Sequence, residues 1–127
     1  MKDITGLPDI KTFVDDFYAK VRKDDFIGPI FMNTIEDWTP HLDKMYGFWN
    51  AALFNVPGFK GNPFAKHTPL KIEPAHFDRW LLLFNQTIDA NFKGSMANVT
   101  KNRAQLMATM FMKRLAMLGD GHSKVVY

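Results

Sequence analysis

The sequence contains no cysteine, and this absence removes several classes of protein from consideration. Disulfide-stabilised scaffolds, thiolate zinc sites, iron–sulfur clusters and cysteine nucleophiles are all excluded. If the chain binds a metal ion, its protein ligands must therefore be histidines or carboxylates.

The chain also lacks the long apolar run of a membrane span and the hydrophobic core of a signal peptide. Its net charge is only +3 at pH 7, and basic residues alternate with acidic ones instead of forming a stripe. These features predict a cytoplasmic protein that binds neither membranes nor nucleic acid. Without repeats or low-complexity segments, residues 1–127 are expected to form one domain, with an N-terminal extension over 1–7 and a flexible tail over 120–127.

Aromatic residues and methionine, in contrast, are abundant, with twelve Phe, three Trp and eight Met. A small helical core usually relies on leucine and isoleucine, whose rotamers are better defined. The excess is typical either of a bundle packed with Phe and Met or of a pocket for a large, flat, apolar ligand.

Apolar residues recur at helical spacing in four segments, which predicts an all-α domain. The predicted helices cover residues 8–23, 37–53, 74–91 and 95–118. Between the first two predicted helices, Gly28 and Pro29 are expected to interrupt helical structure, and the apolar residues 30–32 are expected to form a corner where the chain changes direction. A long loop rich in glycine and proline, residues 54–66, argues against an up-and-down bundle with short connections.

Residues 62–69 carry helix-capping signals at both ends. Asn62 can cap a helix, Pro63 suits a first helical position, and Pro69 prevents the turn from continuing. His67 is therefore expected on a single turn that is fixed at both ends. A lone histidine is often only a packing or surface residue, so this pattern by itself leaves a ligand role open.

Three polar side chains lie on or beside the predicted apolar stripes. His41 is at the N-terminal end of its helix, where the dipole and burial favour neutral imidazole, although it could equally reach solvent. Tyr18 borders one stripe and Trp80 is at the centre of another, so their O–H and N–H groups need an acceptor such as a carbonyl or a ligand. His76 is expected to be a solvated neighbour of a helix cap.

A flat iron macrocycle would account for the two histidines and the aromatic excess together. His41 and His67 could face each other across an apolar slot, and haem iron takes a neutral imidazole on one side. Tyr18 and Trp80 could then supply donors on the other side.

The ordered set of motifs resembles a group III truncated haemoglobin over residues 10 to about 118. The resemblance is carried by Phe17–Asp24, Gly28–Phe31, Trp38 with His41, Phe48–Trp49, Gly61–Pro63 with His67, and Phe77 with Trp80. It implies a truncated globin fold, a two-over-two helical sandwich that encloses haem b, iron protoporphyrin IX.

The same resemblance implies a role for each candidate residue. His67 corresponds to the proximal iron ligand, Tyr18 and Trp80 to distal hydrogen-bond donors, and His41 to the distal gating histidine. The remaining candidates for contact with haem are Phe31, Lys44, Met45, Phe48 and Phe77, with Phe31 stacked on the porphyrin and Lys44 beside a propionate. Met45 departs from the family pattern, in which a branched aliphatic residue is common.

The resemblance further implies a protein that binds dioxygen and related diatomic ligands. Tight oxygen retention would suit reaction with nitric oxide, or peroxidase-like chemistry, better than oxygen transport. Turnover would need a separate reductase, because the chain has no flavin or nicotinamide motif, and a monomer or weak dimer is expected. The alternatives are a haem-based sensor and a haem-free helical adaptor, whereas a zinc hydrolase is disfavoured because no His-Glu-x-x-His spacing occurs.

Overall fold

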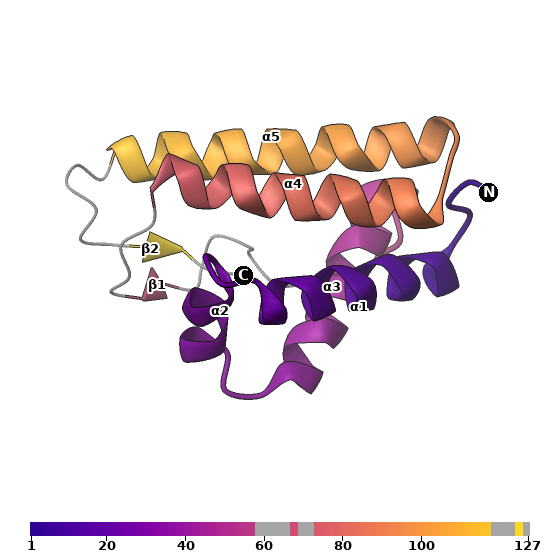
Figure 1. Cartoon of the computed structure of the whole chain (residues 1–127). Coiled ribbons are helices and arrows are strands. Elements are labelled where there is room, and N and C mark those ends of the chain that lie inside the picture. The colour runs from indigo at the N-terminus through magenta and orange to yellow at the C-terminus, as the bar shows by residue number, and fades with distance from the viewer. Residues whose placement is uncertain (58–66, 69–72, 118–123, 126–127) are drawn as a thin grey trace.

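The computed structural model describes residues 1–57, 67–68, 73–117 and 124–125 (Figure 1). Its helices are α1 (Leu7–Lys23), α2 (Gly28–Thr34), α3 (Trp38–Phe54), α4 (Pro74–Asn91) and α5 (Ser95–Met117). Two short strands, β1 (His67–Thr68) and β2 (Lys124–Val125), pair in antiparallel fashion. Apart from this short ladder the described elements are helical, so the predicted all-α class is confirmed.

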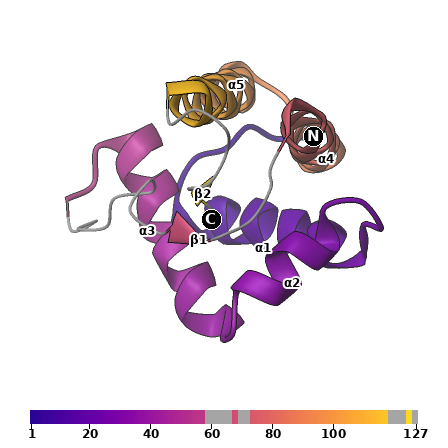
Figure 2. The same ribbon diagram turned by 90° about the vertical axis from the view of Figure 1, so that its left-hand side faces the viewer.

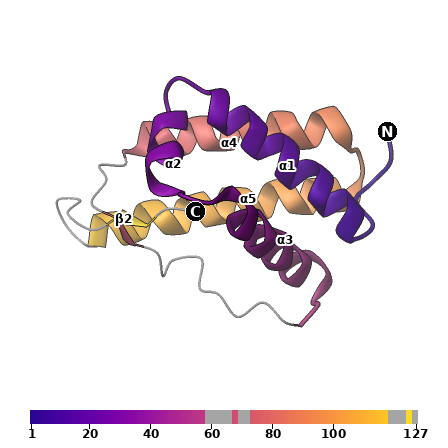
Figure 3. The same cartoon turned by 90° about the horizontal axis from the view of Figure 1, so that it is seen from below.

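The four long helices form two layers of two. α4 and α5 run side by side in one layer, while α1 and α3 form the other and cross beneath them (Figures 2 and 3). α4 packs against both α5 and α1, and α3 packs against α1 and α5. The structure thus has the predicted two-over-two arrangement. None of the helices within the described ranges is both long and apolar enough to cross a lipid bilayer.

α1 follows its predicted boundaries because its ends carry clear signals. Gly6 precedes the helix, Pro8 lies in the first turn, and Asp9 adds the negative charge favoured there. Basic residues in the last turn complement the opposite end of the helix dipole. The buried residues of its apolar face recur at helical spacing and are Ile10, Phe13, Val14, Phe17, Tyr18 and Val21.

The segment after α1 is a short helix, α2, where the sequence predicted a break and a corner. Asp24 ends α1, and its Oδ2 atom accepts a hydrogen bond from the N–H of Ile27 at 2.9 Å. Gly28 lies so close to α1 that a Cβ atom there would be 2.8 Å from the carbonyl oxygen of Val21. Pro29 acts as a first-turn helix residue, and seven residues are too few for periodicity to reveal the helix.

Capping groups define the starts of α3 and α4. The Asp37 side chain accepts a hydrogen bond from the N–H of Thr39 at 3.2 Å. At α4, the Nδ1 atom of His76 accepts from the N–H of Glu73 at 2.8 Å as half of a capping box. His76 is half-buried and stacks on Phe26, with 4.5 Å between ring centroids. The predicted position of His76 beside the helix cap is confirmed, but its imidazole is only partly solvated because it serves both as cap acceptor and as stacking partner.

Asp3 joins the N-terminal extension to the start of α5. Its two carboxylate oxygens accept hydrogen bonds from the N–H groups of Met96 at 2.9 Å and Ala97 at 2.8 Å. The bond from Met96 is the main reason that the pKa of Asp3 is lowered. Gly94 has a φ of 144°, and a Cβ atom there would be 2.5 Å from the Asp3 carboxyl carbon. Figures 1 and 3 accordingly place the N-terminus beside the turn between α4 and α5.

Aromatic rings from α1, α3 and α4 form the centre of the core. Phe84 of α4 is buried and stacks on Trp49 at 5.3 Å and on Trp80 at 5.6 Å between ring centroids. Phe13 and Phe17 of α1 meet Phe84 edge-on at 5.8 and 5.2 Å. Stacked and edge-on pairs are the arrangements that ring quadrupoles favour. Much of the aromatic content therefore serves the packing of three helices.

The predicted flexible tail over 120–127 contains β2, which pairs with β1 from the long connection between α3 and α4. Its other residues, and residues 58–66 of the predicted loop, lie outside the described part of the chain. α5 ends at Met117, one residue before the predicted end of the last helix.

Asp3→Ala is expected to lower the melting temperature, because it removes the acceptor for two N–H groups at the start of α5. Asp3→Asn should retain part of the cap and lose the charge. Since the pKa of Asp3 lies below its ordinary value of 3.8, the charge stabilises the fold above that pH and ceases to do so as the pH falls through the folded value.

Thermal unfolding followed by circular dichroism at neutral pH and at a pH well below 3.8 measures this effect. The melting temperatures of the wild type and Asp3→Asn should differ less at the acidic pH than at neutral pH. A difference that does not depend on pH would contradict the role of the Asp3 charge.

Phe84→Ala is expected to lower the free energy of unfolding by about 3–5 kcal/mol, because it leaves a cavity among rings that cannot fully collapse. Leu82→Ala is the matched control, since Leu82 lies on the same helix but is 50% exposed. In urea denaturation, Leu82→Ala should change the free energy of unfolding by less than about 0.5 kcal/mol. Equal costs for the two variants would show that Phe84 is not central to the core.

Candidate functional site

The site is built around Tyr18, which lies on α1 and is almost entirely buried. Its ring meets Phe31 of α2, with 6.2 Å between ring centroids. On α3, the rings of Trp38 and His41 lie 5.6 and 5.1 Å from it. All of these pairs are edge-on, so rings from α2 and α3 together fix the orientation of this phenol on α1.

Burial sets the protonation state of Tyr18. Removal from water raises the pKa of its phenol well above the ordinary value of 10.0. The hydroxyl therefore keeps its proton at physiological pH and retains its capacity to donate a hydrogen bond. The prediction of a buried tyrosine at this position is confirmed.

Trp80, on α4, joins this group through Phe17. The Phe17 ring meets Tyr18 at 5.0 Å and Trp80 at 5.5 Å between centroids, edge-on in both cases. Trp80 is only half-buried, which is less than its central place in the apolar stripe predicts. The two predicted donors therefore come from different helices and share one neighbouring ring.

His41 lies in the first turn of α3 and packs among aromatic rings. The residue is half-buried, and its Nε2 atom is shielded from solvent. The ring of Trp38 meets it edge-on at 5.7 Å, in addition to its contact with Tyr18. From the sequence, the His41 side chain could lie either in the interior or in solvent, and the structure places it towards the interior.

The predicted wall residues come from three helices. Phe31 of α2, Met45 of α3 and Phe77 of α4 are buried, whereas Phe48 of α3 is half-buried. Phe77 stacks on Phe111 of α5, with 6.0 Å between ring centroids. These side chains belong to or pack against one apolar core, to which each of the helices α2 to α5 contributes.

His67 lies in β1 and not on the helical turn that the sequence predicts. Its backbone pairs with that of Val125 in β2. The prediction of a helical turn is wrong at this residue. Thr68 is β-branched and precedes Pro69, and both properties favour an extended backbone there. Residues 62–66, which would complete the turn, lie outside the described part of the chain.

The described side chains include rings and polar groups of the kinds that line a haem pocket. Phe48 and Trp80 pack against the core but are only half-buried, as expected of rings that can also cover a flat ligand. Tyr18 and His41 place a hydroxyl and an imidazole among apolar rings. Lys44 is exposed, three residues after His41 on the same helix, where a cation can meet a carboxylate at the solvent edge.

The sequence motifs assign no role to Trp38 or Arg22, yet both lie at the site. Trp38 touches Tyr18 and His41, and the Arg22 guanidinium lies over the Trp38 ring, 4.3 Å from its centroid. Their spacing could have indicated this, because Trp38 precedes His41 by three residues and Arg22 follows Tyr18 by four. Side chains at these separations are neighbours on a helix.

A two-over-two helical fold with a buried tyrosine that lies against a half-buried histidine among aromatic rings defines a small globin of the truncated type. Residues 2–116 match the bacterial-like globin family. The group 3 truncated hemoglobin ctb of Campylobacter jejuni is 37% identical over 118 residues, which cover 89% of this chain and 92% of that protein. The crystal structure of group III truncated hemoglobin from Campylobacter jejuni matches with a TM-score of 0.80 and 31% identity, over 91% of this chain and 95% of that chain.

The chain therefore belongs to the bacterial-like globins and, among them, to the group III truncated haemoglobins. The predicted family and the truncated globin fold are both confirmed. Membership of this family implies a haem-binding protein whose ligands are diatomic gases.

Proposed function

We propose that the chain binds haem b and acts on dioxygen and related diatomic ligands, in nitric oxide detoxification or peroxidase-like chemistry and not in oxygen transport. The observation that supports this most directly is the burial of Tyr18 against His41 and Trp38. A neutral phenol enclosed by rings is a strong donor in a site with little water. A polar ligand would be retained there long enough to react.

The haem itself would be held by residues from several elements. His67, whose backbone lies in β1, is the proposed ligand of the iron. The proposed contacts with the macrocycle are Phe31, Met45, Phe48 and Phe77, with Lys44 at a propionate. When bound, haem supplies an iron atom that takes up the diatomic ligand.

Tyr18, Trp80 and His41 are the proposed catalytic residues. Tyr18 donates from its hydroxyl, which burial keeps protonated, and Trp80 donates from its indole N–H, which can only donate. His41 lies beside Tyr18 and closes the route by which ligands enter. Apolar rings surround the buried Tyr18, so a hydrogen bond from its hydroxyl to a partly charged ligand would be stronger than in solution.

Repeated turnover requires a supply of electrons from another protein. The sequence has no nucleotide-binding glycine motif for a flavin or nicotinamide cofactor, so the reductase would be a separate chain. We further propose a cytoplasmic monomer or weak dimer as the working form.

His67→Gly is expected to abolish stable iron ligation, because no other side chain is proposed on that side of the haem. His41→Ala should leave haem bound, since His41 acts in ligand entry. Absorption spectra of both variants, purified and supplied with haem, measure this. A five-coordinate imidazole spectrum in His67→Gly would reverse the assignment of His67 and His41 to the two sides of the haem. A wild type without a Soret band would contradict the proposed function.

Tyr18→Phe and Trp80→Phe should each speed the dissociation of dioxygen. Hydrogen bonds to a charged acceptor contribute roughly 1.5–3 kcal/mol, which corresponds to about tenfold to a hundredfold in rate. Stopped-flow kinetics measure the rates, and the double variant should show less than the sum of the two effects because both donors serve one acceptor.

Carbon monoxide is the control for these two variants, because it is much less polar than dioxygen. Its dissociation should change far less, which separates a lost hydrogen bond from a loosened pocket. If oxygen release is unchanged in both single variants, Tyr18 and Trp80 are core residues and the proposed chemistry loses its basis.

A further inference from the structure

Trp38 forms a closed triangle of rings with Tyr18 and His41. It begins α3 and is half-buried. Its ring lies 5.6 Å from Tyr18 and 5.7 Å from His41, and those two rings lie 5.1 Å apart, measured between centroids. The interplanar angles are 60°, 88° and 83°, so all three pairs are edge-on. Because edge-on contacts are directional, each ring restricts the orientation of the other two.

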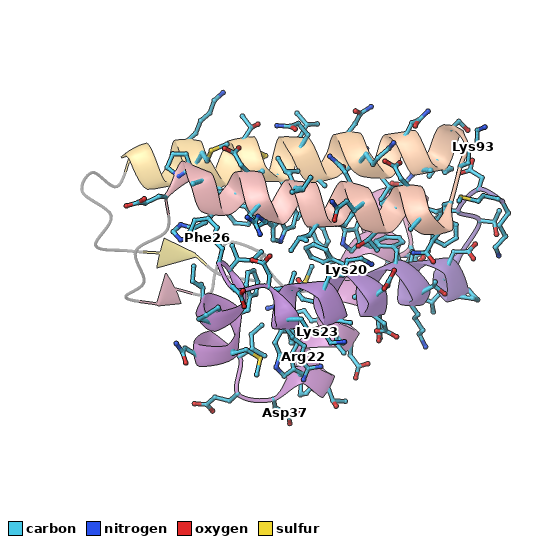
Figure 4. The ribbon with its side chains drawn as sticks, in the orientation of Figure 1. Lys20, Arg22, Lys23, Phe26, Asp37 and Lys93 are labelled. Atoms are coloured by element: carbon cyan, nitrogen blue, oxygen red, sulfur yellow. The ribbon has the colours of Figure 1, made fainter. Side chains whose placement is uncertain are left out.

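Arg22 covers the same tryptophan from α1. The central carbon of its guanidinium is 4.3 Å from the centroid of the Trp38 ring, within the range of a cation–π contact. Figure 4 shows Arg22 at the end of α1, in the region between α1 and the start of α3. Since Arg22 is exposed, its guanidinium covers Trp38 from the solvent side.

The triangle limits the motion of His41. To swing outward, His41 must part from both Tyr18 and Trp38. Tyr18 cannot follow, because it is buried among residues of three helices. Trp38 is the less buried partner, and it is held by Arg22 and by the helix start that Asp37 caps.

We propose that Trp38, held in place by Arg22, is a positioning residue that keeps His41 in the interior and thereby limits the rate at which ligands enter. This inference rests on the proposed function, in which haem lies beside His41. Trp38 acts through His41 and is not itself a catalytic residue. A side chain that controls such a gate changes entry rates without taking part in the chemistry.

Carbon monoxide association after flash photolysis tests the inference, because this ligand reports entry with little contribution from hydrogen bonding. Trp38→Leu keeps an apolar side chain but removes the ring, and it should raise the association rate about tenfold. Arg22→Gln should raise the rate about threefold, whereas Arg22→Lys should stay near wild type because the cation is retained. Lys23→Gln, the adjacent exposed cation on α1, is the matched control and should change nothing.

The His41→Ala background separates positioning from packing. If Trp38 acts through His41, then Trp38→Leu should cause no further change in association rate when His41 is already absent. An undiminished effect of Trp38→Leu in that background, or an unchanged rate in the single variant, would overturn the inference.

A second measurement does not depend on haem. The His41 ring protons should carry ring-current shifts from Trp38 and Tyr18, which nuclear magnetic resonance of histidine-labelled protein detects, with His41→Ala to assign the signals. Trp38→Leu should move these signals and Lys23→Gln should not. A missing Soret band would reject the proposed function alone, whereas identical His41 signals in wild type and Trp38→Leu would reject the positioning role.

Discussion

The stacking of Phe84 on two tryptophans is the contact on which the rest of the structure depends. Phe84 lies on α4, Trp49 on α3, and Phe17 of α1 meets the same ring edge-on. Because ring pairs have preferred angles and the interior is close-packed, this cluster constrains how the three helices are rotated as well as how closely they approach. Tyr18 follows Phe17 in sequence, and Trp80 lies one turn before Phe84. Core packing therefore determines where the two donors of the site lie.

Several polar contacts lie at helix ends, where backbone groups lack partners within the helix. Asp3 accepts from two N–H groups at the start of α5. Arg79 pairs with Asp24 at 2.8 Å and so joins the start of α4 to the corner between α1 and α2. Burial alone would raise the pKa of Asp24, but hydrogen bonds from the Ile27 N–H and from Arg79 hold it below its ordinary value. The ends of the helices are thus fixed by named polar pairs, and the middles by rings.

In the proposed function, the contacts among Tyr18, Trp38 and His41 link the retention of a ligand with its entry. Tyr18 is the proposed hydrogen-bond donor that slows ligand loss, and its ring is also one corner of the triangle that it forms with Trp38 and His41. Trp38 touches both residues, so a change there alters the surroundings of the donor and of the gate together. In a haem-binding globin of this size few side chains can reach the site, which is why we propose the same cluster for both steps.

The sequence by itself determined the features whose signals are local. The bounds of α1, α3 and α4 and the burial of Tyr18 follow from apolar periodicity and from caps such as Asp37, and the family follows from ordered motifs. Only the tertiary structure decided α2, the extended backbone at His67 and the contact of Arg22 with Trp38. α2 depends on close approach to the end of α1, and His67 on pairing with β2. Arg22 and Trp38 meet only after α1 and α3 have docked, because the angle between two helices is set by core packing that no local pattern encodes.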